Sequence, residues 1–140
     1  MGRINYLLDT NILSEPARLK PNGKVMQNFA KYDGQYATSS IVWHELNYGC
    51  QLLADSRRKS QLQSYLSMLI DNGLVILPYD QRAAEWFATQ RAQLKNQGKT
   101  PAYADGEIAA IAAVNELTLV TRNTQDFSCY PTLKLANWFE

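Results

Sequence analysis

Histidine and cysteine are scarce in this 140-residue chain, which contains one histidine and two cysteines. Cys50 and Cys129 lie far apart and match neither a CxxC pattern nor a mixed Cys/His spacing, which argues against a zinc site and against a disulfide framework. His44 cannot form a metal cluster alone, so a general base is its one plausible catalytic role. We interpret the cysteines as ordinary thiols and His44 as a partly buried structural residue.

The chain also lacks a strong charge imbalance and a long apolar run. A formal net charge of +1 provides no overall attraction to nucleic acid or membrane, so polyanion binding would need a local patch. No apolar stretch approaches the length that spans a bilayer, and the first three residues lack the basic segment and apolar core of a secretory signal. We therefore expect a cytoplasmic protein with no membrane association.

Repeats, linkers and low-complexity segments are absent as well. The length and the 46% hydrophobic content fit one globular domain with a sizeable core, so residues 1–140 are expected to form a single domain. Strand-like segments occur at 4–8, 35–39, 74–78, 117–121 and, weakly, 133–137, and helical periodicity occurs at 23–32, 41–54, 57–70, 81–98 and 106–116. This alternation predicts an α/β fold of three layers, in which helices flank a mostly parallel sheet of four to five strands.

An acid follows the first predicted strand directly, in INYLLDTN at residues 4–11. In an open parallel sheet, ligands bind beyond the carboxyl ends of the strands, and Asp9 stands at such an end. Asp is also a favoured N-cap residue, so Asp9 could simply cap the turn that follows.

A second acid interrupts the apolar side of a predicted helix. Helical spacing places Glu45 within a stripe that also contains Ile41, Val42, Gly49 and Leu52. A carboxylate facing a core is unfavourable unless a cation, a hydrogen-bond network or protonation compensates it. Either Glu45 belongs to a functional site, or it pairs with an arginine or lies at an exposed helix end.

Further polar residues fall at the same predicted edge of the sheet. Asp105 precedes an alanine-rich helix that leads into the strand at 117–121, and it too could be only an N-cap. Asn123 and Asp126 follow that strand, although Asp126 could instead cap the turn before Phe127. In a parallel sheet, Asp9, Glu45 and Asp105 converge with this polar pair.

A cluster of carboxylates repels itself, so a cation must hold it together. Oxygen-only ligands favour Mg²⁺ or Mn²⁺ over zinc. Such ions assist phosphoryl chemistry, because they lower the pKa of a bound water and stabilise the leaving oxygen. The pattern does not distinguish one ion from two.

Four segments together resemble the PIN-domain ribonucleases, specifically the VapC toxins of bacterial toxin–antitoxin pairs, with FitB-type proteins as the closer match. They are LLDTNILSEP (7–16), SSIVWHELNYG (39–49), ADGEIAAIA (104–112) and LTLVTRNTQDF (117–127), in family-like order and spacing. The resemblance identifies Asp9, Glu45 and Asp105 as the three acids of the family. It implies a PIN-like fold and a Mg²⁺- or Mn²⁺-dependent endoribonuclease that hydrolyses RNA phosphodiester bonds with a metal-activated water.

The resemblance also implies partners. It predicts a homodimer, and a small DNA-binding antitoxin (VapB-like) that inhibits the toxin. Apolar and aromatic helix faces around Trp43, Tyr48, Tyr65 and Trp86 exceed what a small sheet covers, which agrees with pairing.

One position departs from the family pattern. Many members carry an Asp directly after TR, where this chain has Asn123. Either Asp126 supplies the missing carboxylate, which makes Asp9, Glu45, Asp105 and Asp126 the metal ligands, or the site has three acids. The candidate catalytic residues therefore include both Asn123 and Asp126, together with the three acids.

Other functions fit less well. A receiver domain needs an acidic pair after its first strand and a lysine at a later strand end, and a haloacid-dehalogenase-type phosphatase needs a second Asp where Asn11 stands. A catalytically silent PIN-like module that binds RNA or protein for regulation remains the alternative. RNA binding requires cations near the acids, and the candidates are Arg18, Lys20, Arg91, Lys95, Lys99 and, best placed, Arg122.

Overall fold

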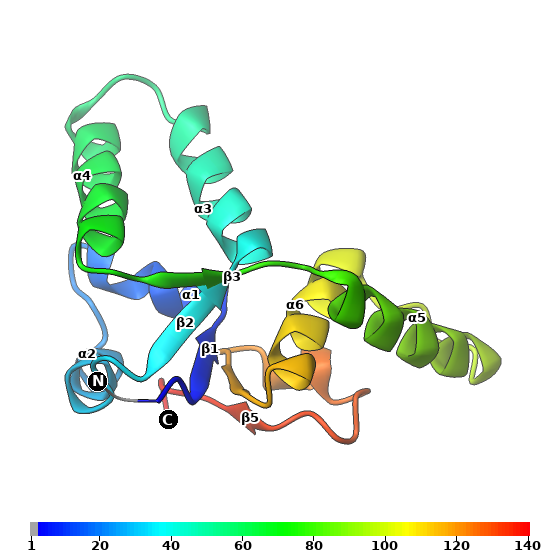
Figure 1. Ribbon diagram of the computed structural model, residues 1–140. Helices are drawn as coiled ribbons and strands as arrows, with labels where there is room; N and C mark the ends of the chain where they lie inside the picture. Colours follow the sequence, from blue (N-terminus) through cyan, green and yellow to red (C-terminus); the bar gives the residue numbers. More distant parts are fainter. Residues whose placement is uncertain (1–2) are drawn as a thin grey trace.

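A five-stranded parallel sheet forms the centre of the protein (Figure 1). The computed structural model describes residues 3–140, so Met1 and Gly2, which belong to the expected domain, lie outside the described residues. The strands are β1 (Tyr6–Leu8), β2 (Tyr36–Ser39), β3 (Val75–Leu77), β4 (Thr118–Val120) and β5 (Leu135–Ala136). Their spatial order is β3-β2-β1-β4-β5, and every neighbouring pair is parallel. The expected parallel α/β fold is confirmed.

Six α-helices and two short 3-10 helices flank this sheet within residues 3–140. They are α1 (Thr10–Leu13), η1 (Glu15–Ala17), α2 (Gly23–Lys31), α3 (Ser40–Leu52), α4 (Arg57–Asp71), α5 (Gln81–Asn96), α6 (Tyr103–Val114) and η2 (Thr124–Phe127). The five helices expected from periodicity are present, but α6 begins three residues earlier than expected. In the described part of the chain, no helix is both long and apolar enough to cross a membrane.

The strand order reverses at β1, which lies between β2 and β4. Leu8 is in register with Thr38 of β2 and with Val120 of β4, so β1 and β4 end at one level and β2 ends one residue later. The crevice outside the carboxyl ends of the strands, at such a reversal, is the general ligand position of open α/β sheets. Asp9 follows β1 there, and its N–H donates a 2.9 Å hydrogen bond to the carbonyl of Val120.

Helix α6 packs closely against α5 because a glycine lies at the contact. Gly106 is buried, and a Cβ added to it would overlap the ring of Phe87 on α5. The following residues, Ile108 to Ala112, are almost completely buried, as the alanine-rich pattern predicts. This packing fixes the first turn of α6, which carries Asp105.

Helices α3 and α4 form an antiparallel hairpin that projects from the rest of the molecule at the top of Figure 1. The buried residues of α3 are Val42, Leu46 and Cys50, whereas Leu52 is 67% exposed. The buried face of α3 therefore differs from the apolar stripe expected from helical spacing. Glu45 lies at the edge of this buried face. His44 is exposed and stacks on Tyr48, with ring centroids 6.2 Å apart, so its interpretation as a partly buried residue was wrong.

Candidate functional site

Asp9 is a buried carboxylate, 9% exposed, at the end of the central strand. Its Oδ1 accepts a 2.8 Å hydrogen bond from the N–H of Thr10, so it does cap α1. Its Oδ2 accepts a 2.7 Å bond from the hydroxyl of Thr121, which follows β4. Burial raises the pKa of Asp9; the Thr121 and Thr10 bonds oppose this rise, and the charges of Glu45 and Asp126 add to it.

Glu45 faces Asp9 from the first half of α3. Its Oε2 accepts a 2.8 Å hydrogen bond from the hydroxyl of Thr10, the residue after Asp9. None of the ion pairs among residues 3–140 involves Glu45, so the arginine partner considered as an alternative is wrong. The half-buried carboxylate is instead held by a neutral donor, which leaves its negative charge uncompensated.

Asp105 lies inside the first turn of α6 and does not cap it. The N-cap position is Ala102, which provides no side-chain bond, so the N-cap alternative for Asp105 is wrong. Burial raises the pKa of Asp105, and the charges of Asp9, Asp126 and Glu45 raise it further, in that order. No protein donor within residues 3–140 bonds to this half-buried carboxylate.

Asn123 directly precedes η2, and Asp126 lies within it. The N–H of Asn123 donates a 3.1 Å hydrogen bond to the hydroxyl of Thr121, while its exposed side chain makes no capping bond. Asp126 is in the first turn of η2 and is not its N-cap, so the capping alternative for Asp126 is wrong. Its charge raises the pKa of both Asp9 and Asp105.

The structure thus brings four acids into one electrostatic group: Asp9, Glu45, Asp105 and Asp126. In the arrangement they adopt, no set of three His, Cys, Asp or Glu side chains in residues 3–140 could hold a metal ion. The donor chemistry nevertheless fits Mg²⁺ or Mn²⁺, because Mg²⁺ keeps several waters and is usually bound by one or two carboxylates together with substrate phosphates. A wide group of carboxylates suits that mode better than a closed cage.

Two threonines contact the acids, and sequence reasoning assigned neither of them. Thr10 bonds to Glu45 through its side chain and to Asp9 through its backbone. Thr121 donates to Asp9 and accepts from Asn123, so it ties the central strand to the loop that carries Asp126. Their signal was adjacency, since Thr10 directly follows the first acid and Thr121 directly precedes the RN pair.

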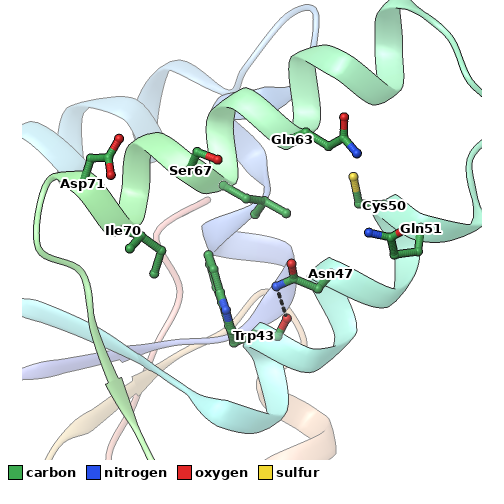
Figure 2. A pocket seen from close by; sticks show the side chains of 9 residues that line it. Trp43, Asn47, Cys50, Gln51, Gln63, Ser67, Ile70 and Asp71 are labelled. Atoms are coloured by element: carbon green, nitrogen blue, oxygen red, sulfur yellow. Dashed lines mark hydrogen bonds between the residues drawn. The ribbon is translucent and has the colours of Figure 1, made fainter.

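A separate hollow of about 470 Å³ lies between α3 and α4 (Figure 2). Its lining includes Trp43, Asn47 and Cys50 of α3 and Gln63, Ser67 and Asp71 of α4. None of the four acids lines this hollow. The candidate catalytic site is therefore the group of acids near the carboxyl ends of the central strands, and not the hollow between α3 and α4.

Comparison with known proteins agrees with this geometry. The family model described as "PIN domain" matches residues 6–131. The chain is 38% identical over 128 residues to Toxin FitB of Neisseria gonorrhoeae, covering 86% of this chain and 89% of that protein. It is 32% identical over 136 residues to Ribonuclease VapC2 of Haemophilus influenzae, covering 96% and 98%.

A solved structure matches over nearly the whole length. The crystal structure of FitAcB from Neisseria gonorrhoeae superimposes with a TM-score of 0.86 and 35% identity, covering 96% of this chain and 99% of that one. The family model spans most of the chain, and the relatives share about a third of its residues over most of their length. The chain belongs to the PIN-domain family, in the group that contains FitB and VapC toxins.

Proposed function

We propose that this protein is a metal-dependent endoribonuclease and the toxin of a toxin–antitoxin pair. The observation that carries the proposal is the electrostatic group of four acids contributed by the ends of β1 and β4 and by helices α3 and α6, in which buried Asp9 and half-buried Asp105 both have raised pKa values. Like charges that raise one another's pKa without a protein cation among them indicate a site for a positive ligand. The names of the two relatives, a toxin and a ribonuclease, support the same activity.

Asp9, Glu45, Asp105 and Asp126 are the candidate ligands for Mg²⁺ or Mn²⁺, of which one or two would bind the ion together with substrate phosphates. When bound, such an ion supplies Lewis-acid activation of water and neutralises charge at the scissile phosphate. The chain itself orients the carboxylates. The hydroxyl of Thr121 fixes Asp9, and Asp105 is positioned by the tight contact of α6 with α5.

The alternative is a catalytically silent PIN-like module that binds RNA or protein. Purified protein incubated with total RNA in Mg²⁺, in Mn²⁺ and in EDTA distinguishes the two. We expect cleavage with either ion, none in EDTA, and none with Asp105→Asn in any buffer. Binding of RNA without metal-dependent cleavage would support the silent module instead.

We also propose two protein partners, namely a second copy of this chain and a small DNA-binding antitoxin. An active ribonuclease toxin must be neutralised in the cell that makes it, so a short reading frame for the antitoxin should neighbour this gene. Expression of this chain alone should arrest growth, and co-expression of the neighbour should restore it. Growth arrest that persists in the Asp105→Asn variant would separate toxicity from RNA cleavage and contradict the proposal.

The proposed homodimer is tested by analytical sedimentation. A monomer at micromolar concentration would contradict it.

A further inference from the structure

Three cations gather around one hollow on the α5 side of the protein. The hollow, of about 490 Å³, lies between α5 and the segment that returns from α5 to α6, and its lining includes Arg91, Lys95 and Lys99. We call these three residues and the hollow they line the basic hollow. The other lining residues are Ala88, Ala92, Thr100 and Pro101, none of which is charged. The cationic charge of the hollow is therefore not balanced by an acid in its wall.

Helix-end electrostatics do not account for this arrangement. A cation in the last turn of a helix is stabilised by the helix dipole, which explains Lys95. Arg91 lies more than one turn earlier, and Lys99 lies beyond the helix end. All three residues are exposed, and none belongs to an ion pair among residues 3–140. In a chain with a net charge of only +1, three unpaired cations on one hollow indicate an anionic ligand.

An exposed aromatic ring adjoins the basic hollow through its contact with Arg91. Tyr103 begins α6, two residues before Asp105, and is 58% exposed. Arg91 holds this ring in place, since its guanidinium bonds to the phenol oxygen and lies 4.4 Å from the ring centroid. The ring also packs edge-on against Phe87, with centroids 6.4 Å apart. Tyr103 is thus a fixed aromatic group that is open to solvent.

The chain itself limits the distance from this patch to the acids. Asp105 is six positions after Lys99, so their Cα atoms lie no more than about 22 Å apart even if the segment is fully extended. Tyr103 falls within that segment. An adjoining hollow shares Ala88 and Arg91 with the basic hollow and is also lined by Tyr103 and one acid, Glu107, so the cationic surface is confined to the α5 side. A single strand a few nucleotides long can span from the basic hollow to Asp105.

We propose that the basic hollow binds the phosphate backbone of an RNA strand and that Tyr103 stacks on one of its bases. Cations that follow a backbone, combined with aromatic rings that stack on bases, are the general means of binding single strands without sequence preference. This inference rests on the proposed ribonuclease function, for which it supplies the path of the substrate to the acids. Arg122, the cation best placed by the sequence, lies 4.4 Å from the ring centroid of Phe139 and stays a separate prediction.

The test measures RNA binding separately from cleavage. Binding of a fluorescein-labelled oligouridylate of about 12 nucleotides is followed by anisotropy in EDTA, across a series of salt concentrations. The double variant Lys95→Gln/Lys99→Gln should bind several-fold more weakly, and the negative slope of log K against log salt should become shallower by about 1.4, about 0.7 for each lost phosphate contact. The matched control is Arg3→Gln/Lys134→Gln, which removes two exposed charges that precede β1 and β5 and should leave the slope unchanged.

A second pair of variants tests the aromatic ring. Tyr103→Ala should weaken binding at least about fivefold, whereas Tyr103→Phe, which keeps the ring, should bind nearly as well as wild type. Thermal melting of each variant verifies that it is folded. Equal binding by Tyr103→Ala and wild type would overturn the stacking role.

The outcomes separate this inference from the proposed function. If wild type cleaves RNA and the Lys95/Lys99 variant binds and cleaves equally well, the basic hollow is not the RNA path and the ribonuclease proposal stands. If binding depends on the hollow but no metal yields cleavage, the hollow is supported and the ribonuclease proposal fails. Three results would each overturn the assignment. They are no binding of the probe by wild type, an equal loss of affinity in the Lys95/Lys99 and Arg3/Lys134 double variants, and displacement of the probe by polyglutamate as readily as by unlabelled oligouridylate.

Discussion

The hydroxyl of Thr10 donates a 2.8 Å hydrogen bond to Oε2 of Glu45 and so connects the end of β1 to the side of α3. The same residue donates its backbone N–H to Asp9. One threonine therefore positions two of the four acids, the first through the main chain and the second through the side chain.

Replacement of this hydroxyl should impair cleavage more than folding. Thr10→Val keeps the shape of the side chain but removes the donor, so Glu45 loses its orienting bond, and we expect kcat/KM to fall about tenfold or more. Thr10→Ser keeps a hydroxyl and should retain most of the activity. RNA cleavage at saturating Mg²⁺ measures both variants. Equal activity of the valine and serine variants would show that Glu45 needs no such orientation.

The charge of Asp105 should destabilise the metal-free protein near neutral pH. Its pKa is raised above the ordinary value of 3.8, so stability is greatest below that value and is lost as the pH rises through the raised pKa. Asp105→Asn lacks this loss, so its free energy of unfolding in EDTA should exceed that of wild type at about pH 7 and approach it at about pH 4. Urea titrations at both values measure the difference.

Two further variants define the origin of that effect. Asp33→Asn removes an equal charge from the exposed turn before β2 and is the matched control. Asp9→Asn should gain less than Asp105→Asn, because Asp9 accepts two hydrogen bonds that an amide cannot reproduce fully. A pH-independent gain for Asp105→Asn would mean that charge repulsion is not its cause.

Much of this arrangement follows from the sequence by elementary patterns. The five strands are short apolar segments, and the long helices show three- and four-residue spacing, so both were predicted with nearly correct bounds. α1, η1 and η2 were missed because three or four residues are too few for periodicity. The start of α6 was misplaced for a physical reason. Ala102 has no side chain that can cap a helix, whereas Asp105 has the chemistry of a cap but lies within the first turn.

The candidate site was less accessible to sequence reasoning than the fold. Acids at strand ends could be recognised because a parallel sheet brings those ends together. The stripe of α3 was misjudged because the helix projects beyond the sheet, which leaves Leu52 exposed despite its apolar character. The roles of Thr10 and Thr121 depend on contacts between residues 35 and 112 positions apart, which no local pattern reveals.

Two glycine substitutions should have opposite effects on stability, because Gly106 lies at the close contact of α6 with α5 and Gly49 has open space around it. Gly106→Ala would force a methyl group into the ring of Phe87 and should lower the free energy of unfolding by about 1–3 kcal/mol. Gly49→Ala, in an exposed part of α3 with open space around it, should raise stability by about 0.5–1 kcal/mol because alanine is the better helix former. Chemical denaturation measures both. Gly106→Ala with wild-type stability would show that α6 is free to shift away from α5.

The last prediction concerns the position where this chain departs from its family. Asp126 contributes charge to the acid group and makes no capping bond, whereas Asn123 is neutral, and both residues are exposed. Asp126→Asn should therefore lower cleavage nearly as much as Asp105→Asn and weaken Mg²⁺ binding, without lowering the melting temperature of the metal-free protein, because the substitution removes a repelling charge. Asn123→Asp should alter activity little, because Asp126 already provides the fourth carboxylate. Mg²⁺ titration of each variant, with melting in EDTA as the control, decides between them. A titration of Asp126→Asn that overlays wild type would remove Asp126 from the site, and tighter Mg²⁺ binding by Asn123→Asp would assign the fourth position to residue 123.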